Sequence, residues 1–591
     1  MNNRFKPALT MILAAMLTFS LASCSNEEDF ASAYGTSNTL LTYIPEDAPY
    51  MAGNLEPIPE DFLVSMFLRL EPALTAVQAD LEYALADLEL NADIDDSSHA
   101  LALAVLNELD GNLNAEGLRS LGFTMKPQQV IYGMGMFPVI RVSLADAQAL
   151  RDTIARIELN SGVGFPEHEH QGQSYWKLSD DGGSRDGFNG GVYLAIIQKG
   201  SDAHLAFSVF PTQSEAELLP AFLGQKMPAT DTAAMRLAEI NQDYNFTPYG
   251  TGIFDFQLAF DQLTDPNSTL RRSLEQAGED EFEQISAVCQ AEIESIIAYA
   301  PRMIAGTTEM TQSAVGAEYR LELESNLATE LAGLVANVPP VPTQTERLLE
   351  LAFGIRIGAA RDFMTTKLTE MSLAQFECEH LRDINSWASD TLVKLNYPMP
   401  PLVNNLFGMR ASLDQMPEHQ GDISSARGSF AIHMDKPEMV LGMAKMFLPA
   451  MENVEIEKGG PPVELPQSVL PVPGVTAYAA MSDSALGIAL GQDETAGLSA
   501  YLAEESEGTG SFFSVNYDMA TYMERMNILT DDLIDAGVMR QDYDSDMALE
   551  HHSEVQEAFQ NALTEMADRN LLEFRFDDRG LAIENRMQFR D

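Results

Sequence analysis

An order of elements that recurs along the chain constrains the fold more than any other feature. Residues 130–144 have strand character, and residues 145–159 have the spacing of an amphipathic helix. Two strand-like stretches over 191–210 then predict a hairpin, and a capped helix over 212–224 closes the unit. The pattern predicts a strand–helix–hairpin unit.

The same order returns much later in the chain. A strand over 428–434 precedes a helix over 435–451, and the Pro-rich stretch 459–474 leads to a second hairpin over 475–491. A short helix over 493–503 follows it. Because one such unit leaves one face of its strands uncovered, we expect antiparallel sheets with helices packed on one face.

Two fainter copies of the unit occupy residues 251–336 and 511–589. We therefore predict an α+β fold with two lobes, each made of two units. The N-terminal lobe spans 40–343, the C-terminal lobe spans 397–591, and a helical connector over 344–396 joins them, bracketed by Pro-rich stretches.

The first two dozen residues have the pattern of a targeting segment. Arg4 and Lys6 precede an apolar run over 8–22, which is shorter than the roughly 20 residues that span a bilayer. Leu21-Ala22-Ser23-Cys24 follows, and this stretch resembles the lipobox of bacterial lipoproteins. An ordinary cleaved signal with a chance cysteine is the alternative.

The lipobox resemblance implies a signal peptide over 1–23 and acyl chains on Cys24, which would anchor the protein to a membrane. Ser25 after the cysteine implies the outer membrane, with the protein on its periplasmic face or at the cell surface. The polar, acidic residues 24–39 then predict a flexible tether. The order of elements and the stretch 132–144 also resemble uncharacterised proteobacterial envelope lipoproteins, which implies no particular activity.

The charge balance argues against two kinds of partner. The chain has 35 basic and 89 acidic residues, a formal net charge of −54. Such a surface repels nucleic acid and anionic lipid headgroups. It favours solubility in salt, loosely held divalent cations or basic partners, and no cofactor is expected.

Cys289 and Cys378 both lie in stretches with helical spacing. In an exported protein such a pair predicts a disulfide, which would contribute about 4–5 kcal/mol by closing its long loop. Two buried thiols, or a metal site with His380, are the alternatives. The metal site would have at most three ligands, so the disulfide is preferred.

Linear motifs for catalysis are weak. The sequence has no nucleophile elbow, phosphate loop or HExxH motif. Ser174 and Lys177 match the S-x-x-K spacing, but in strand-like sequence instead of at a helix start. His168 and His170 would share one face of a strand and make half of a metal site, although an exposed loop is the alternative reading. No metal site is therefore assigned.

Two further groups of residues are candidates for binding. Tyr175, Trp176 and Phe188, beside the Gly-rich stretch 181–191, would form an adaptable rim, with a disordered hairpin tip as the alternative. The methionines 439, 443 and 446 have helical spacing that suits a Cu(I) site or a core-facing stripe, and the core is favoured.

The leading functional hypothesis is a non-catalytic, lipid-anchored envelope protein that binds a partner protein or an apolar ligand between its sheet and helices. The alternative is an envelope-acting hydrolase with a carboxylate or histidine site that no linear motif reveals. Carboxylates of raised pKa converging in a deep cleft would favour the enzyme. An apolar groove or flat patch would favour binding.

Overall fold

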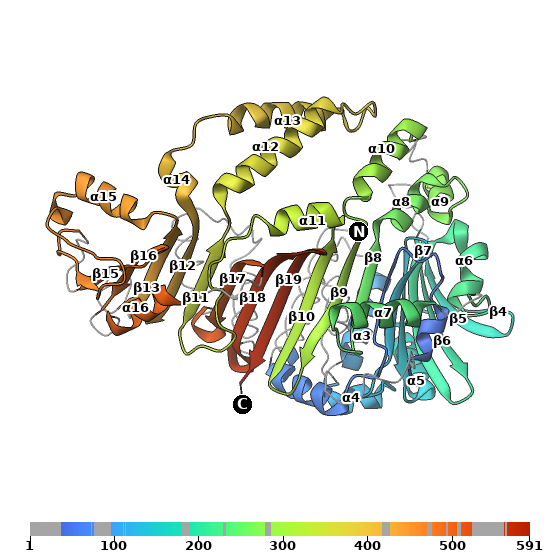
Figure 1. The fold of residues 1–591 in the computed structure, drawn as a ribbon. Coiled ribbons are helices and arrows are strands. Elements are labelled where there is room, and N and C mark those ends of the chain that lie inside the picture. The colour runs from blue at the N-terminus through green and yellow to red at the C-terminus, as the bar shows by residue number, and fades with distance from the viewer. Residues whose placement is uncertain are drawn as a thin grey trace.

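The computed structural model describes residues 37–72, 74–75, 96–109, 111–112, 114–179, 190–228, 232–277, 285–415, 426–469, 475–491, 495–504, 510–522, 561 and 564–590. These residues form one continuous antiparallel sheet of 19 strands with helices packed on both of its faces (Figure 1). The expected α+β class is confirmed.

The strands of the first half of the chain are β1 (Tyr50–Gly53), β2 (Gln129–Met134), β3 (Phe137–Leu144), β4 (Glu167–His170), β5 (Gln173–Ser179), β6 (Gly190–Lys199), β7 (Asp202–Pro211), β8 (Thr251–Asp255), β9 (Arg302–Met310) and β10 (Ala314–Glu322). Those of the second half are β11 (Leu349–Gly354), β12 (Leu406–Gln415), β13 (Arg427–Met434), β14 (Val463–Glu464), β15 (Ala477–Met481), β16 (Ala485–Leu490), β17 (Ser511–Asp518), β18 (Ala567–Asp577) and β19 (Gly580–Phe589).

The helices are α3 (Asp96–Leu109), α4 (Ala115–Ser120), α5 (Ala147–Ser161), α6 (Glu215–Phe222), α7 (Ala233–Tyr244), α8 (Phe256–Thr264), α9 (Thr269–Ala277), α10 (Ala287–Ile297), α11 (Ser325–Ala332), α12 (Ile357–Leu373), α13 (Arg382–Leu395), α14 (Pro401–Asn405), α15 (Pro437–Phe447) and α16 (Thr495–Ala503). Short 3-10 helices are η2 (Thr39–Tyr43), η3 (Thr212–Ser214) and η6 (Pro449–Met451). Residues 60–72 are also helical.

The strand pairings run across the whole sheet in a single order: β4, β5, β6, β7, β3, β2, β1, β8, β9, β10, β19, β18, β17, β11, β12, β13, β16, β15 and β14. In this order, the strands β5, β6, β7, β3, β2, β1, β8, β9 and β10 correspond one by one to β14, β15, β16, β13, β12, β11, β17, β18 and β19. The two halves of the chain therefore arrange their strands in the same way. The two halves meet where β10 pairs with β19, in a register centred on Glu318 opposite Glu584. The sheet is therefore built from two copies of one strand arrangement, and it continues from one copy to the other through the β10–β19 pair.

Local signals explain the helix within the first unit. The side chain of Asp146 accepts hydrogen bonds from the backbone N–H groups of Gln148 and Ala149, which otherwise lack partners at the start of α5. Gly162 ends the helix in the left-handed conformation, with φ of 66°. Helix α5 therefore has both of its ends capped by the residues that the sequence supplies.

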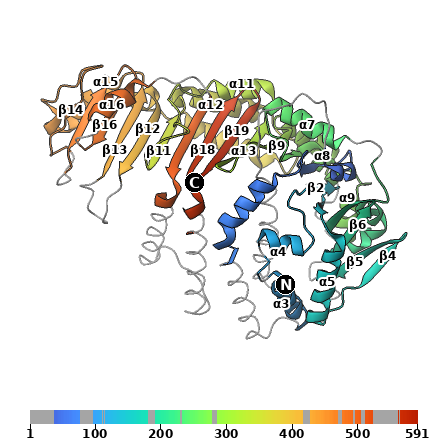
Figure 2. The same cartoon turned by 90° about the horizontal axis from the view of Figure 1, so that it is seen from below.

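Each half of the sheet has helices on both faces over part of its strands. In the first half, α6 and α7 cover the face that carries Tyr132 and Ile304, whereas α5 covers the other face with Leu150. In the second half, α16 covers the face of Ala431, and α15 covers the other face with Leu441. Figure 2 shows the sheet running as an arc, with α3 and α4 inside its curve near β4–β6.

Two expected boundaries require correction. Residues 349–354, placed in the helical connector, form the central strand β11, which pairs with β12 and β17. The stretch LELAFG is a short and mostly apolar run, and periodicity alone does not separate a strand from a helix in such a run. In the expected tether, buried Asn38 caps η2, which starts at Thr39, so these two residues belong to the fold.

Candidate functional site: an apolar open face of the sheet

Directly paired residues of antiparallel strands lie on the same face of a sheet, so rows of side chains can be followed from strand to strand. Across β10, β19, β18, β17, β11, β12 and β13, one such row is Tyr319, Ile583, Phe574, Phe513, Phe353, Met409 and Ile432. The next row is Ala317, Asn585, Leu572, Val515, Leu351, Ala411 and Phe430. Neither row contains a charged side chain. We call the surface formed by these two rows the open face.

In the part of the chain that the structure describes, the side chains of the open face keep partial access to solvent, and residues 60–72 pack on the same face beside it, against Val315 and Met587. Every residue of the two rows is half-buried or exposed, and Met409 and Phe430 are each 41% exposed. Seven neighbouring strands at about 4.8 Å spacing make this surface about 29 Å wide. Isolated apolar residues are normal on a protein surface, whereas a contiguous row of them across seven strands makes this face a candidate interaction site.

The charged residues that alternate with these two rows along the strands lie on the opposite face, which we call the covered face. Glu318 accepts a hydrogen bond from Arg320 Nε at 3.0 Å, and Arg575 contacts both Glu318 and Glu584, the latter at 2.9 Å. Arg320 Nη1 lies 2.6 and 2.7 Å from the two carboxylate oxygens of Asp577. The charges at the junction of the two halves are therefore paired with one another beneath the open face.

A second group of charges on the covered face consists of Glu350, Asp414 and Arg347. Burial raises the pKa of both carboxyl groups, against the opposing effect of Arg347, which lies 3.2 Å from Glu350 and 3.3 Å from Asp414. Glu350 Oε2, Asp414 Oδ2 and Ser412 Oγ are buried without a hydrogen-bond partner. Glu350 is only 5% exposed, so this carboxyl group is in the interior and does not line a cleft.

The predicted aromatic rim is wrong for two of its three residues. Tyr175 and Trp176 are neighbours on β5 and point to opposite faces, because side chains alternate along a strand. Both are buried: Trp176 packs with Leu150 and Ile196, and Tyr175 belongs to the large core of the first half. Phe188 lies outside the described residues.

Tyr175 instead belongs to a cluster around Glu215, the first residue of α6. The Glu215 carboxylate accepts hydrogen bonds from Tyr175 Oη at 2.9 Å, Lys177 Nζ at 2.5 Å and Tyr193 Oη at 3.1 Å. Burial alone would raise the pKa of Glu215, but these bonds outweigh it and lower the pKa. Burial and Glu215 together raise the pKa of Tyr175 to about 12. The cluster fastens the start of α6 to the sheet.

The other predicted chemistry on these strands is not assembled. Ser174 and Lys177, three positions apart on β5, lie on opposite faces, so they cannot act as an S-x-x-K pair. His168 stacks on Tyr175 with ring centroids 5.4 Å apart, and His170 Nδ1 lies 2.5 Å from Gln225 Oε1. Within the described ranges, no three His, Cys, Asp or Glu side chains are grouped as metal ligands.

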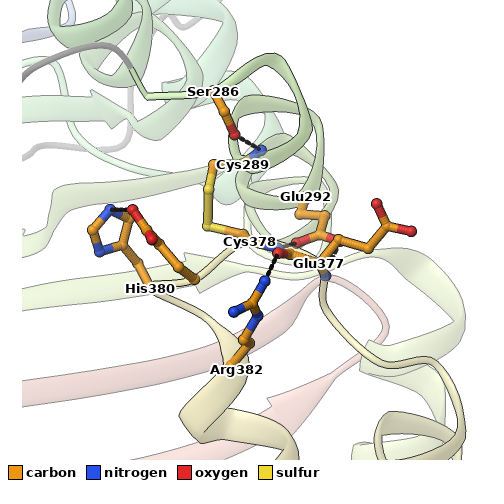
Figure 3. Close-up of a disulfide and its surroundings, with 8 residues drawn as sticks. Ser286, Cys289, Glu292, Glu377, Cys378, His380 and Arg382 are labelled. Carbon is orange, nitrogen blue, oxygen red and sulfur yellow. Dashed lines mark hydrogen bonds and ion pairs between the residues drawn. A yellow bond between two sulfur atoms is a disulfide. The ribbon is translucent and has the colours of Figure 1, made fainter.

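The expected disulfide is present. Cys289 of α10 and Cys378, in the turn between α12 and α13, are joined by an S–S bond of 2.11 Å (Figure 3). Glu292 strengthens the connection by accepting hydrogen bonds from the backbone N–H groups of Glu377, at 2.8 Å, and Cys378, at 2.9 Å. The disulfide thus attaches the α12–α13 hairpin to a helix from the other half of the chain.

The methionine stripe of α15 differs from the expectation of a core stripe. Met443 and Met446 are exposed, and Leu441 is the side chain that packs on the sheet. The i, i+4, i+7 spacing shows that residues share one face of a helix, but it does not show whether that face is covered. The pattern alone therefore led to the wrong expectation that these methionines are in the core.

The open face itself was not singled out from sequence, although a signal exists. Residues 317–322 alternate strictly, with Glu318, Arg320 and Glu322 separated by Tyr319 and Leu321. Such alternation places charged and apolar side chains on opposite faces of a strand. The usual assumption is that the apolar face of a strand is buried. Here the opposite holds, because Glu318 and Arg320 are buried and Tyr319 lies on the open face.

No known protein family, curated protein or solved structure matches this chain. Within the described residues no helix has the length and apolar character needed to cross a membrane. The proposed lipidation site, Cys24, lies outside the described residues.

Proposed function

We propose that this chain is a non-catalytic envelope protein that binds the hydrocarbon part of a lipid-like ligand on the open face. The observation that carries the proposal is the continuous run of uncharged, half-buried or exposed side chains from Tyr319 to Ile432. An apolar ligand laid across these strands would remove this surface from water, at about 25 cal/mol per Å².

The chemistry of the open face favours an aliphatic ligand over a polypeptide. Protein interfaces form about one hydrogen bond per 100–200 Å², so a protein-binding surface needs polar groups within it. The two rows of the open face supply only the Asn585 amide and the Tyr319 hydroxyl. Hydrocarbon chains need no such partners.

The placement of the acidic groups supports a non-catalytic role. The carboxyl groups with raised pKa among the described residues, Glu350, Asp414 and Glu573, lie on the covered face, opposite the proposed ligand. The lipobox-like residues 21–24 support the remaining parts of the proposal, which are an acyl anchor on Cys24 and a position on the periplasmic side of the outer membrane.

The test is a titration of the purified protein with the fluorescent apolar probe N-phenyl-1-naphthylamine, together with mass spectrometry of co-purifying lipid. The double variant Met409→Glu/Phe430→Glu places two charges on exposed positions of the open face. We expect it to bind the probe at least tenfold more weakly and to retain less lipid. Leu159→Glu is the matched control, because this side chain is 79% exposed on α5.

Unchanged probe binding and lipid content in the double variant would contradict the proposal. A stoichiometric protein partner that dissociates from the same variant would replace the lipid-like ligand with a polypeptide. Near-UV circular dichroism checks that both variants keep the native fold.

A further inference from the structure

Helix α15 carries apolar side chains on both of its sides. Leu441 and Ala444 pack against β15 and β16, which accounts for the inner side. On the outer side Met446 is 72% exposed and Phe447 is 70% exposed, with Met443 and Leu448 beside them. We call Met443, Met446, Phe447 and Leu448 the α15 patch. Figure 1 shows α15 at the outer end of the second half, away from the central strands.

Polar residues that would normally mark the outer side of a surface helix are scarce here. Between Pro437 and Phe447 the only charged residues are Glu438 and Lys445. A helix that is apolar all round is usually covered on both sides. The α15 patch therefore has the composition of an interface.

The charges around the α15 patch restrict what covers it. Five exposed carboxylates lie within the helix or close to it in the sequence: Asp435, Glu438, Glu452, Glu455 and Glu457. The same stretch contains three lysines, Lys436, Lys445 and Lys458, and Lys458 is paired with Glu438 at 3.3 Å. With five carboxylates and three lysines, the rim formed by residues 435–458 has a net charge of −2.

This negative rim disfavours two kinds of occupant. A second copy of the chain would bring the same carboxylates to the interface, and like charges facing each other oppose association. An anionic bilayer surface would be repelled for the same reason. A cationic partner is attracted instead, and its apolar side chains would cover the patch.

We propose that the α15 patch docks a cationic amphipathic helix of a partner protein. Helix α15 is about 16 Å long, which offers a partner helix roughly three turns of contact. Flexible methionine side chains adapt to helices of different sequence, and the acidic rim would pair with the lysines or arginines of the partner. The proposal is independent of ligand binding on the open face.

The test uses the full chain and a labelled 14-residue peptide of leucine and lysine in helical amphipathic spacing. A peptide with glutamate in place of lysine controls for charge, and phosphatidylcholine vesicles with and without phosphatidylglycerol control for membrane binding. The variant Met446→Ser/Phe447→Ser removes the exposed apolar side chains, and Leu159→Ser is the matched control on α5.

We expect the Leu/Lys peptide to bind the wild type and the Leu159→Ser control equally. Binding should be at least tenfold weaker for Met446→Ser/Phe447→Ser and several-fold weaker for Glu452→Gln/Glu455→Gln. It should be unchanged in Met409→Glu/Phe430→Glu, which separates this site from the open face. The Leu/Glu peptide should not bind.

Equal peptide binding by wild type and Met446→Ser/Phe447→Ser would overturn the proposal. Vesicle binding that depends on Met446 and Phe447, without peptide binding, would assign the patch to a bilayer instead. A concentration-dependent dimer that the same variant abolishes would assign it to a second copy of the chain.

Discussion

Glu318 of β10 lies directly opposite Glu584 of β19, and Arg575 of β18 contacts both carboxylates. This arrangement sits at the centre of the register that joins the two halves of the chain. Two like charges at directly paired positions destabilise a sheet, and the positive charge of Arg575 offsets the repulsion between the two glutamates. The continuity of the sheet depends on this ion-pair network on its covered face.

Removing Arg575 should therefore destabilise the junction. Arg575→Met leaves Glu318, whose side chain is 4% exposed, beside Glu584 with less positive charge to compensate. Breaking a buried ion pair on one side costs about 3–5 kcal/mol. Urea unfolding should show a loss of that order. Arg590→Met is the control, because its pair with Asp568 is exposed and contributes under about 1 kcal/mol. Equal losses in the two variants would contradict this account of the junction.

Glu350 should make stability depend on pH. Burial raises the pKa of its carboxyl group above the usual 4.5, so the folded chain holds this proton more tightly than the unfolded chain does. The stabilisation from the proton is complete below pH 4.5 and is lost as the pH rises through the folded-state pKa. Glu350→Gln stays neutral and should unfold at a higher temperature than the wild type at pH 8.

The gain from Glu350→Gln should shrink as the pH falls through the folded-state pKa and vanish below 4.5, where the wild-type carboxyl group is protonated in both states. Thermal unfolding across this range measures it, with the exposed Glu346→Gln as the control. A difference that stayed constant with pH would mean that the proton on Glu350 is not responsible.

The disulfide should stabilise a particular part of the chain. Cys289→Ser/Cys378→Ser removes a link across 89 positions, which the chain-entropy model values at about 4–5 kcal/mol. We expect α10 and the α12–α13 hairpin to exchange backbone amide protons faster, while α5 and β6 stay protected. Hydrogen-exchange mass spectrometry distinguishes this outcome. Uniform protection of α12 and α13 in the double variant would show that packing alone holds the hairpin.

Predictions from sequence succeeded where one local pattern had one physical meaning. The amphipathic spacing of residues 145–159 predicted a helix, and the two strand-like stretches over 191–210, separated by a short turn, were correctly predicted to pair as a hairpin. They failed where the same pattern suits opposite environments. Residues Tyr175 and Trp176 were expected at a rim and are buried, whereas the Met443 and Met446 stripe was expected in the core and is exposed.

The sequence by itself determined the α+β class, the repeated order of strands and helices, and the pairing of Cys289 with Cys378, because capping, periodicity and cysteine count are local or compositional properties. Only the tertiary structure decided that the halves join through β10 and β19, and that the charged face of the central strands is the covered one. Alternation assigns side chains to two faces without saying which face the rest of the chain covers. That choice depends on long-range packing, which among the described residues places the helices over the charged face of the central strands.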